Sequence, residues 1–340
     1  MATANDSFNV ISDKSFGFIG LGIMGWGMAK NLRAKIPTDS MLYICEVNKP
    51  RRDEFAASTA GKIQVVESPR EIAEKSPSGH SSKLKQDIII TMLPRGEHVR
   101  EVFTNPQTGL LSVAGSVKMG SKIFIDCSTI DVKTSQEVAA AVEASDLGCF
   151  ADAPVSGGQG GANTGTLTFM VGGSPESFET AKPTLELMVN PENLFHCGKA
   201  GAGLVTKLIN NYLSAVNMIG VCEGMNMGRL YGLDPVLLAS AINSSTGMSR
   251  NSREQNPVKG VSSTASAAID FEGGFLLCSV TMAMELSEQL GAKSLLAPVV
   301  RDMYDCAVQN AKCRDKDFRS IYRLFSEENG DQLPRKDLKN

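Results

Sequence analysis

Short apolar runs recur along the first part of the chain, and helical patterns of apolar residues lie between them. The runs are rich in Ile, Val, Phe and Leu and end at turn-forming residues, which is typical of buried strands. We predict strands at 16–19, 41–45, 87–93, 122–126, 149–155, 167–171 and 193–197.

Apolar residues between these runs repeat at helical spacing. The clearest helical patterns cover 26–32, 134–144 and 175–188. Strands that alternate with helices pair in parallel and carry the helices on both faces of the sheet. We therefore predict an α/β fold, a Rossmann-type doubly wound parallel sheet.

The pattern changes past residue 203, where helical stretches follow one another and no strand pattern returns. These helical stretches cover 204–228, 235–242, 277–290 and 295–311. We predict an α/β domain over 1–198 and an all-helical domain over 199–330 that begins with a long helix between the domains. We expect a tail at 331–340 and a polar surface insertion at 76–85.

A glycine-rich turn joins the first predicted strand to the helix after it. The turn consists of Gly20, Leu21, Gly22, Ile23, Met24 and Gly25. A strand, a G-x-G-x-x-G turn and a helix form the fingerprint of a dinucleotide-binding site. Gly20 permits a tight turn, Gly22 lets a pyrophosphate approach the backbone, and Gly25 lets the helix pack close to the strand. Free amides at the helix N-terminus then face the phosphates, so we expect the turn to bind a dinucleotide cofactor.

Glu46 ends the second predicted strand, 21 residues after Gly25. An acid at this place accepts hydrogen bonds from the adenosine ribose and repels a 2′-phosphate, which favours NAD. A solvated carboxylate at a strand end is the other interpretation. Arg51 and Arg52 follow closely and offer positive charges to a 2′-phosphate, so NADP is not excluded.

Composition narrows the class of protein. The 340 residues carry a net charge of −3, without the basic excess that indicates a nucleic-acid partner. No apolar stretch approaches the roughly 20 residues that span a membrane, and three histidines without zinc-like spacing indicate no metal site. The N-terminal residues lack the arginines of a transit peptide and the apolar core of a signal peptide, so we expect a cytoplasmic protein.

A second glycine-rich motif begins at Asp152 and continues through Ser156, Gly157 and Gly158. Glycines expose backbone amides, and a serine hydroxyl beside bare amides supplies the several donors that a carboxylate takes up at once. We expect residues 156–158 to bind the carboxylate of a small-molecule substrate. A flexible turn between two strands is the alternative.

Lys207 and Asn211 are four residues apart near the start of the long predicted helix and share one of its faces. Lys207 has two interpretations. It is either a surface lysine whose apolar stem lies along the protein, or a buried amine whose pKa is lowered by burial. In the second case the amine gives a proton to a carbonyl as hydride arrives. Spacing alone favours neither interpretation. In the second, Asn211 orients the substrate hydroxyl or the lysine itself.

Four motifs resemble those of the β-hydroxyacid dehydrogenase family. In chain order they are FIGLGIMGWGMAKNL, TMLP, DAPVSGGQGGANTGTLTFMVGG and GAGLVTKLINN, and the similarity extends over residues 15–328. The resemblance implies that Lys207 is the catalytic lysine, that Asn211 is its partner, and that 156–158 form the substrate loop. It also implies a homodimer or homotetramer built on the helical domain, and by analogy with the family it leaves a mitochondrial location open beside the expected cytoplasmic one.

The resemblance further implies a set of positions along the bound cofactor. These positions are Leu93, Pro94, His98, Thr129 and Met282.

The chain departs from the family pattern in the helical domain. The family carries Lys-Asp within a helix after Gly-Phe, whereas this chain has Met282 and Ala283 after Gly274-Phe275. The family's lysine reaches the cofactor, and methionine keeps its length but loses the charge and the hydrogen-bond donors. Arg250 or Arg253 can supply a positive charge to a carboxylate instead. Solvated surface arginines are the other interpretation.

These observations together predict an oxidoreductase that transfers a hydride between a nicotinamide cofactor and a short 3-hydroxy acid. Lys207 is its expected general acid and base, and NAD is the expected cofactor. Two alternatives stay open. One is a specialised reductase for a different carbonyl or for an imine, and the other is a non-catalytic protein that binds a dinucleotide.

Overall fold

The computed structural model describes residues 14–75, 87–262, 276–314 and 316–326. The expected insertion at 76–85, the Gly274-Phe275 pair and the expected tail at 331–340 lie outside the described residues. The chain forms two compact units, unit 1 (Met1–Lys207) and unit 2 (Leu208–Asn340). The division falls inside one helix, α9 (Ala202–Tyr231), whereas the sequence patterns placed a boundary before that helix.

Unit 1 is built on one mostly parallel sheet with the strand order β3-β2-β1-β4-β5-β6-β8-β7, in which β9 also pairs with β8. Neighbours from β3 to β6 run parallel, and β8 runs antiparallel to β6 and β7. The strands are β1 (Phe16–Ile19), β2 (Leu42–Cys45), β3 (Ile63–Val65), β4 (Asp87–Thr91), β5 (Lys122–Asp126), β6 (Gly148–Asp152), β7 (Val155–Ser156), β8 (Leu167–Gly172) and β9 (Val189–Gly198). The predicted Rossmann-type fold is confirmed, and β8 and β9, which run opposite to the strands from β3 to β6, are its departure from a purely parallel sheet.

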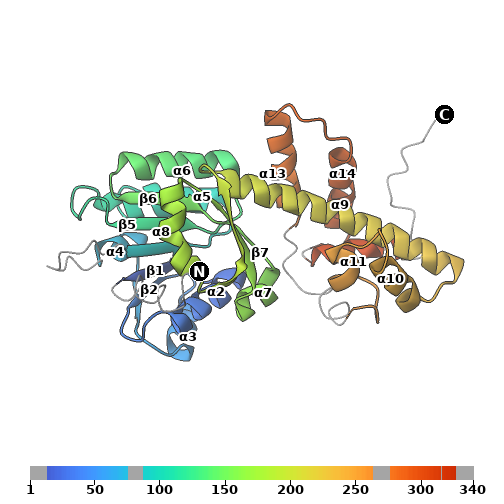
Figure 1. Ribbon diagram of the computed structural model, residues 1–340, viewed down its shortest axis with the longest axis horizontal. Coiled ribbons are helices and arrows are strands. Elements are labelled where there is room, and N and C mark those ends of the chain that lie inside the picture. Colours follow the sequence, from blue (N-terminus) through green and yellow to red (C-terminus); the bar gives the residue numbers. More distant parts are fainter. Residues whose placement is uncertain (1–13, 76–86, 263–275, 315, 327–340) are drawn as a thin grey trace. The chain divides into compact units, whose positions relative to one another are not determined.

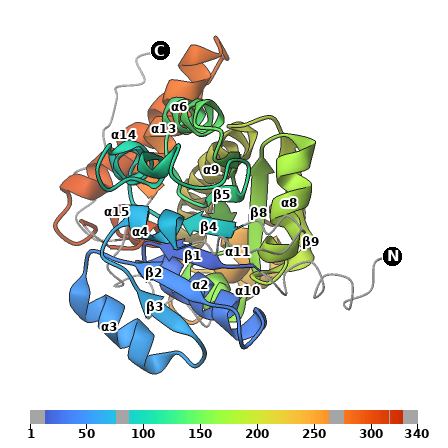
Figure 2. The same ribbon diagram turned by 90° about the vertical axis from the view of Figure 1, so that its left-hand side faces the viewer.

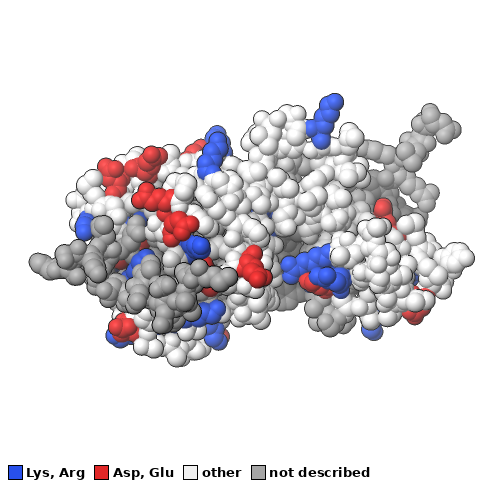
Figure 3. Space-filling model, viewed as in Figure 1, with Lys and Arg blue, Asp and Glu red and all other residues white. Residues whose placement is uncertain are grey.

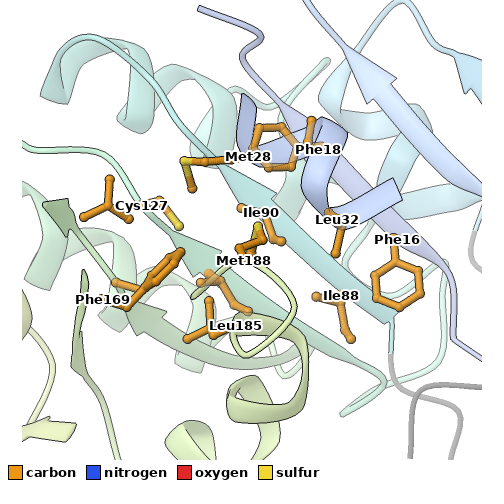
Figure 4. Packing of buried hydrophobic residues seen from close by; sticks show 14 of the residues in the cluster. Phe16, Phe18, Met28, Leu32, Ile88, Ile90, Cys127, Phe169, Leu185 and Met188 are labelled. Carbon is orange, nitrogen blue, oxygen red and sulfur yellow. The ribbon is translucent and has the colours of Figure 1, made fainter. Parts of the chain in front are cut away.

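Helices cover both faces of this sheet (Figures 1 and 2). They are α2 (Ile23–Lys35), α3 (Lys49–Ser58), α4 (Pro69–Glu74), α5 (Gly96–Thr104), the 3₁₀ helix η1 (Leu110–Val113), α6 (Val132–Ala144), α7 (Gly158–Thr164) and α8 (Pro175–Leu185). Alternate strand residues face opposite helical layers, since Phe16 and Phe18 belong to one buried cluster and Ile19 to the other. Figure 4 shows the first cluster, to which α2 contributes Met28 and Leu32.

Four helices of unit 1 are capped by a side chain at their first turn, whereas the two helices that follow the glycine motifs are not. Side chains of Asn48, Ser68, Asp131 and Ser174 accept hydrogen bonds from first-turn amides and so begin α3, α4, α6 and α8. By contrast, α2 and α7 begin at glycines without a side-chain cap. Their first amides are therefore left for another partner.

Unit 2 consists of helices around a separate core. They are the main part of α9, then α10 (Pro235–Asn243), α11 (Arg250–Glu254), α13 (Leu276–Gln289), α14 (Ala297–Gln309), the 3₁₀ helix η2 (Phe318–Tyr322) and α15 (Arg323–Ser326). Met218, Cys222 and Met225 of α9 pack with Val280 and Tyr304 in this core. The predicted all-helical second domain is confirmed. Within the described ranges, no helix is long and apolar enough to cross a membrane.

A buried carboxyl group organises the polar side chains where β4 and β5 end. The Oδ1 atom of Asp126 accepts hydrogen bonds from the Thr91 hydroxyl at 2.7 Å and the Ser128 hydroxyl at 2.6 Å. The Ser128 oxygen in turn accepts the amide of Leu93 at 2.9 Å. Asp126 is only 1% exposed, and its Oδ2 atom has no hydrogen-bond partner among the described residues. Burial raises the pKa of Asp126 to about 6, against the opposing effect of these hydrogen bonds.

The raised pKa of Asp126 predicts a pH-dependent penalty on stability. In the unfolded chain the carboxyl ionises near its ordinary pKa of 3.8. The folded protein therefore loses stability as pH rises above this value, because burial disfavours the charged carboxylate, and the loss is nearly complete above about pH 6. Asp126→Asn does not titrate and keeps an acceptor for Thr91 and Ser128. From pH 4 to pH 7 we expect the unfolding free energy of this variant to rise relative to the natural protein by about 2 kcal/mol.

Urea unfolding of both proteins at several pH values measures this difference. A difference that stays constant between pH 4 and pH 7 contradicts the assignment of the raised pKa to Asp126.

Candidate active site

The glycine turn between β1 and α2 has the shape that a dinucleotide requires. Gly20 has a φ of +93°, and a Cβ atom there would lie 2.3 Å from the carbonyl oxygen of Met92. A Cβ on Gly25 would lie 2.0 Å from the carbonyl oxygen of Gly20, so only glycine lets α2 start this close to β1. A Cβ on Gly22 would meet nothing within 4 Å, which leaves open space beside the backbone. The turn and the uncapped start of α2 therefore fit a pyrophosphate group.

Two residues that follow β2 hold the glycine turn at Leu21, one at its amide and the other at its carbonyl oxygen. Glu46 accepts the amide of Leu21 at 2.6 Å and the amide of Asn48 at 2.8 Å. The guanidinium of Arg51 donates to the carbonyl oxygen of Leu21 and, at 3.2 Å, to that of Gly22. We call this arrangement of Glu46 and Arg51 around Leu21 the Leu21 clasp.

The two arginines after β2 are already engaged. The Arg51 guanidinium also lies 5.0 Å from the ring centre of Trp26 on α2, a cation–π arrangement. Arg52 is buried and pairs with Glu67 at 3.0 Å and with Asp53 at 3.5 Å. Neither arginine therefore extends freely toward a ligand.

Of the residues expected along the cofactor after β4 and β5, Leu93 is linked to Asp126 by hydrogen bonds through Ser128. Leu93 is half-buried, and its amide is held by Ser128, the neighbour of the buried Thr129. Pro94 is exposed just after Leu93. His98 is exposed on α5, and its Nε2 lies 4.0 Å from a carboxylate oxygen of Glu97.

The expected substrate loop differs in local structure from the prediction. Ser156 lies on β7, but residues 158–164 form the short helix α7 rather than a loop. Gly157 and Gly158 have positive φ angles of +133° and +63°, which turn the chain from the strand into this helix. A Cβ on Gly158 would meet nothing within 4 Å, so the backbone there is accessible.

One side chain ties α7 to the helix of the glycine turn. The amide of Asn31 on α2 donates to the carbonyl oxygens of Ala162 at 2.8 Å and Asn163 at 3.1 Å. A Cβ on Gly27 would lie 2.7 Å from the carbonyl carbon of Ala162, so glycine permits the close approach. The two uncapped helices, which carry the expected cofactor and substrate motifs, are thereby fixed to each other within unit 1.

Lys207 and Asn211 lie one turn apart on α9, and both are buried, with 8% and 7% of their surfaces exposed. Among the described residues, none forms a hydrogen bond or ion pair with the Lys207 amine. Burial lowers the pKa of Lys207 to about 8. The Oδ1 atom of Asn211 accepts a hydrogen bond of 3.3 Å from the side chain of Asn210.

The departures from the family pattern lie in unit 2. Met282 is half-buried in the middle of α13. Arg250 and Arg253 both donate to the carboxylate of Glu254, at 2.8 Å and 2.7 Å, and both are more than half exposed. Their charges are thus shared with an acidic neighbour. In the described part of the chain, no group of three His, Cys, Asp or Glu side chains is arranged to hold a metal ion.

Sequence reasoning missed three groups that shape this region: Asp126, Asp152 and the clasp formed by Arg51. Asp126 ends the predicted strand 122–126, and a charged residue at the carboxyl end of a parallel strand was the available signal. Asp152 lies inside the predicted strand 149–155, and only the structure shows that β6 ends there. The contact from Arg51 to the glycine turn had no such signal, because it depends on the path of the chain after β2.

Comparison with known families agrees with this geometry. Residues 15–198 match the model described as the NAD binding domain of 6-phosphogluconate dehydrogenase. Residues 201–325 match the model described as NAD-binding of NADP-dependent 3-hydroxyisobutyrate dehydrogenase.

Individual relatives match over nearly the whole chain. The human mitochondrial 3-hydroxyisobutyrate dehydrogenase is 39% identical over 329 residues, which are 95% of this chain and 90% of that protein. A probable mitochondrial 3-hydroxyisobutyrate dehydrogenase of Dictyostelium discoideum is 36% identical, over 93% of this chain and 92% of that one. The solved structure of Mycobacterium tuberculosis 3-hydroxyisobutyrate dehydrogenase with L-serine has a TM-score of 0.78 at 29% identity and covers 92% of this chain and 99% of its own. This chain therefore belongs to the 3-hydroxyisobutyrate dehydrogenase family of β-hydroxyacid dehydrogenases and is an NAD(P)-dependent dehydrogenase.

Proposed function

We propose that the protein oxidises a short 3-hydroxy acid such as 3-hydroxyisobutyrate, with Lys207 as the general base, and catalyses the reverse reduction with Lys207 as the general acid. The relatives named above support the substrate class. One of them is described with L-serine, which carries a hydroxyl on C3 and a carboxylate.

The observation that carries this proposal is the burial of Lys207 with no acidic partner in the part of the chain that the structure describes. A lysine amine in water stays protonated far above neutral pH and cannot accept a proton from an alcohol. At a pKa of about 8, a substantial share of the amine is neutral near pH 8. A general acid and base works best when its pKa lies near the operating pH.

The other residues then have distinct roles. The hydroxyl of Ser156 and the amides of Gly157 and Gly158 bind the substrate carboxylate. Asn211, one helical turn from Lys207, orients the substrate hydroxyl or the amine. When bound, the nicotinamide supplies the hydride acceptor or donor. Leu93, Pro94, His98, Thr129 and Met282 remain our proposed cofactor contacts, together with the residues of the glycine turn.

We predict that alcohol oxidation depends on pH through the neutral form of Lys207. The kcat for oxidation should rise with pH and level off above about pH 8, while the kcat for reduction should fall over the same range. Lys207→Ala should lower kcat by about 10²- to 10⁴-fold and leave the Kd for NAD nearly unchanged. Steady-state kinetics and NAD titration measure both effects.

Lys199→Ala is the matched control, because it removes an exposed lysine just before the same helix. Its kcat should equal that of the natural protein. Turnover by Lys207→Ala within a few-fold of normal would overturn the role of Lys207. A panel of hydroxy acids, aldehydes and cyclic imines separates the alternatives: activity on imines alone supports a specialised reductase, and NAD binding without turnover supports a binding protein.

We further propose NAD as the preferred cofactor. Glu46 lies at the end of β2, beside the glycine turn, where it meets the adenosine ribose in such folds. Its charge opposes a 2′-phosphate, since like charges about 4 Å apart repel by about 4 kcal/mol at an effective dielectric constant of about 20. The arginines that would compensate, Arg51 and Arg52, are engaged in the Leu21 clasp and with Glu67.

We predict that kcat/KM with NAD exceeds kcat/KM with NADP by at least about tenfold, which corresponds to about 1.4 kcal/mol. Glu46→Ala should narrow this ratio by weakening the repulsion. Glu74→Ala is the control, because it removes a carboxylate that pairs with Arg70 at 2.6 Å and contacts neither Arg51 nor Arg52, and it should leave the ratio unchanged. A natural enzyme that uses NADP as well as NAD contradicts this assignment.

We also propose that two copies of the chain associate through unit 2. Large apolar side chains are exposed on one stripe of α9 and on the neighbouring α10, which is unusual for a surface in water. They include Ile209, Leu213, Met227, Leu230, Tyr231, Leu233, Val236 and Leu237. Most of the surface of unit 2 seen in Figure 3 carries no charged side chain. The family resemblance, which implies a dimer or tetramer through this domain, identifies a second copy as the occupant.

We predict that Met227→Glu, at a position 66% exposed, shifts the protein from dimer or tetramer to monomer, because a buried unpaired charge in the interface is costly. Met119→Glu makes the same change at a position 63% exposed on unit 1 and should leave the assembly intact. Light scattering coupled to size-exclusion chromatography measures the mass. A natural protein that runs as a monomer refutes this proposal.

The location in the cell has two candidates. The sequence led us to expect the cytoplasm, whereas the curated relatives named above are described as mitochondrial. Our proposal stays with the cytoplasm, and fractionation of the native source distinguishes the two.

A further inference from the structure

Helix α9 begins at a residue that cannot cap it. Its first turn follows Gly201, whose carbonyl oxygen accepts the amide of Val205 at 3.0 Å. Glycine has no side chain to accept the first amides of the helix, and the φ of Gly201 is +89°. The cap must therefore come from elsewhere in the chain.

Asp152, at the end of β6, supplies this cap from a distant part of the sequence. Its Oδ1 atom accepts the amide of Gly201 at 2.7 Å, and its Oδ2 atom accepts the amide of Leu204 at 2.9 Å. The amide of Gly203 also opposes the rise that burial causes in the pKa of this carboxyl group. The amide of Ala202 donates to the carbonyl oxygen of Lys199 at 2.9 Å. Asp152 is therefore the side chain that caps the first turn of α9.

Two glycines make room for the carboxylate. A Cβ on Gly172, the partner of Asp152 across β6 and β8, would lie 2.4 Å from Oδ1. A Cβ on Gly203 would lie 2.8 Å from Oδ2 and 2.2 Å from the carbonyl oxygen of Met170. Asp152 itself is 0% exposed. The carboxylate is therefore enclosed by three backbone segments and holds α9 in one position against the ends of β6 and β8.

The residues on either side of this contact are those of the proposed reaction. Lys207 follows Leu204 by three residues along α9, and Ser156 follows Asp152 by four residues along the chain. The carboxylate is the buried link between the start of the lysine helix and the start of the substrate loop.

We propose that Asp152 is a positioning residue: by capping α9, it sets where the Lys207 amine stands relative to the substrate loop, which begins four residues after Asp152. This inference rests on the proposed role of Lys207. It requires only that the amine must be placed accurately, since small misplacements of reacting groups cost large factors in rate.

Asp152→Asn and Asp152→Ala test the proposal with enzyme saturated in NAD and hydroxy acid. The asparagine keeps one acceptor but turns an amide group toward the other backbone N–H, and the alanine removes both acceptors. We expect kcat to fall by about tenfold for Asn and about a hundredfold for Ala. The number of NAD sites per chain and the Kd for NAD should stay as in the natural protein.

Hydrogen exchange gives a readout independent of turnover. Peptides covering residues 199–207 should exchange faster in Asp152→Asn, while those covering the glycine turn should not change. A role in folding alone would instead lower the number of NAD sites. Ser174→Ala removes the cap of α8 in the same unit, where Ser174 accepts the Ser177 amide at 3.0 Å, and should leave kcat unchanged.

The outcomes separate this proposal from the function on which it rests. A kcat within about twofold of normal for Asp152→Ala overturns the positioning role, as does unchanged exchange in 199–207. Should Lys207→Ala be the variant with normal turnover, the general acid and base assignment falls first, and the exchange data still report whether Asp152 holds the helix.

Discussion

Two buried aspartates at the ends of neighbouring strands fix the functional edge of unit 1. Asp126 and Asp152 are directly paired in register between β5 and β6, and each ends its strand. Asp126 accepts hydrogen bonds from two hydroxyl groups beside the loop that is expected to face the nicotinamide. Asp152 accepts hydrogen bonds from backbone amides at the start of α9. Burial raises the pKa of both carboxyl groups, so each depends on the donors that neighbouring segments bring to it. Moving either segment leaves a buried carboxylate with too few hydrogen bonds, and this constraint holds the site together.

The sequence was sufficient for the strands that are buried on both faces and for the long helices. Such strands are continuous apolar runs bounded by turns, and the predicted 122–126 coincides with β5. The three-residue strand β3 and the polar helix α3 escaped prediction, because neither is long or apolar enough to show a period. Helix α7 was expected as a loop because it is rich in glycine, and its contact with α2 through Asn31 stabilises it despite that composition.

The residues of the candidate site also divide into those that a local sequence pattern predicts and those that depend on packing between distant segments. Positions where only glycine fits, such as Gly20 and Gly25, can be predicted from the sequence, because their spacing belongs to one local geometry. The lowered pKa of Lys207 was not visible, because spacing left surface and buried lysines equally plausible and only packing distinguishes them. Asp152 was part of a recognised motif, yet its role depends on a helix that starts about fifty residues later, a separation that no local pattern encodes.

The Leu21 clasp has a consequence for any change of coenzyme in this protein. Glu46 and Arg51 grip the two ends of one residue in the glycine turn, so the adenosine side and the phosphate side of the dinucleotide pocket are mechanically linked. An exchange at either position disturbs a loop that the other still holds, and their effects cannot be independent. A redesign of this pocket for another coenzyme therefore has to change both side chains together, because a variant with only one of them replaced has a less firmly held glycine turn.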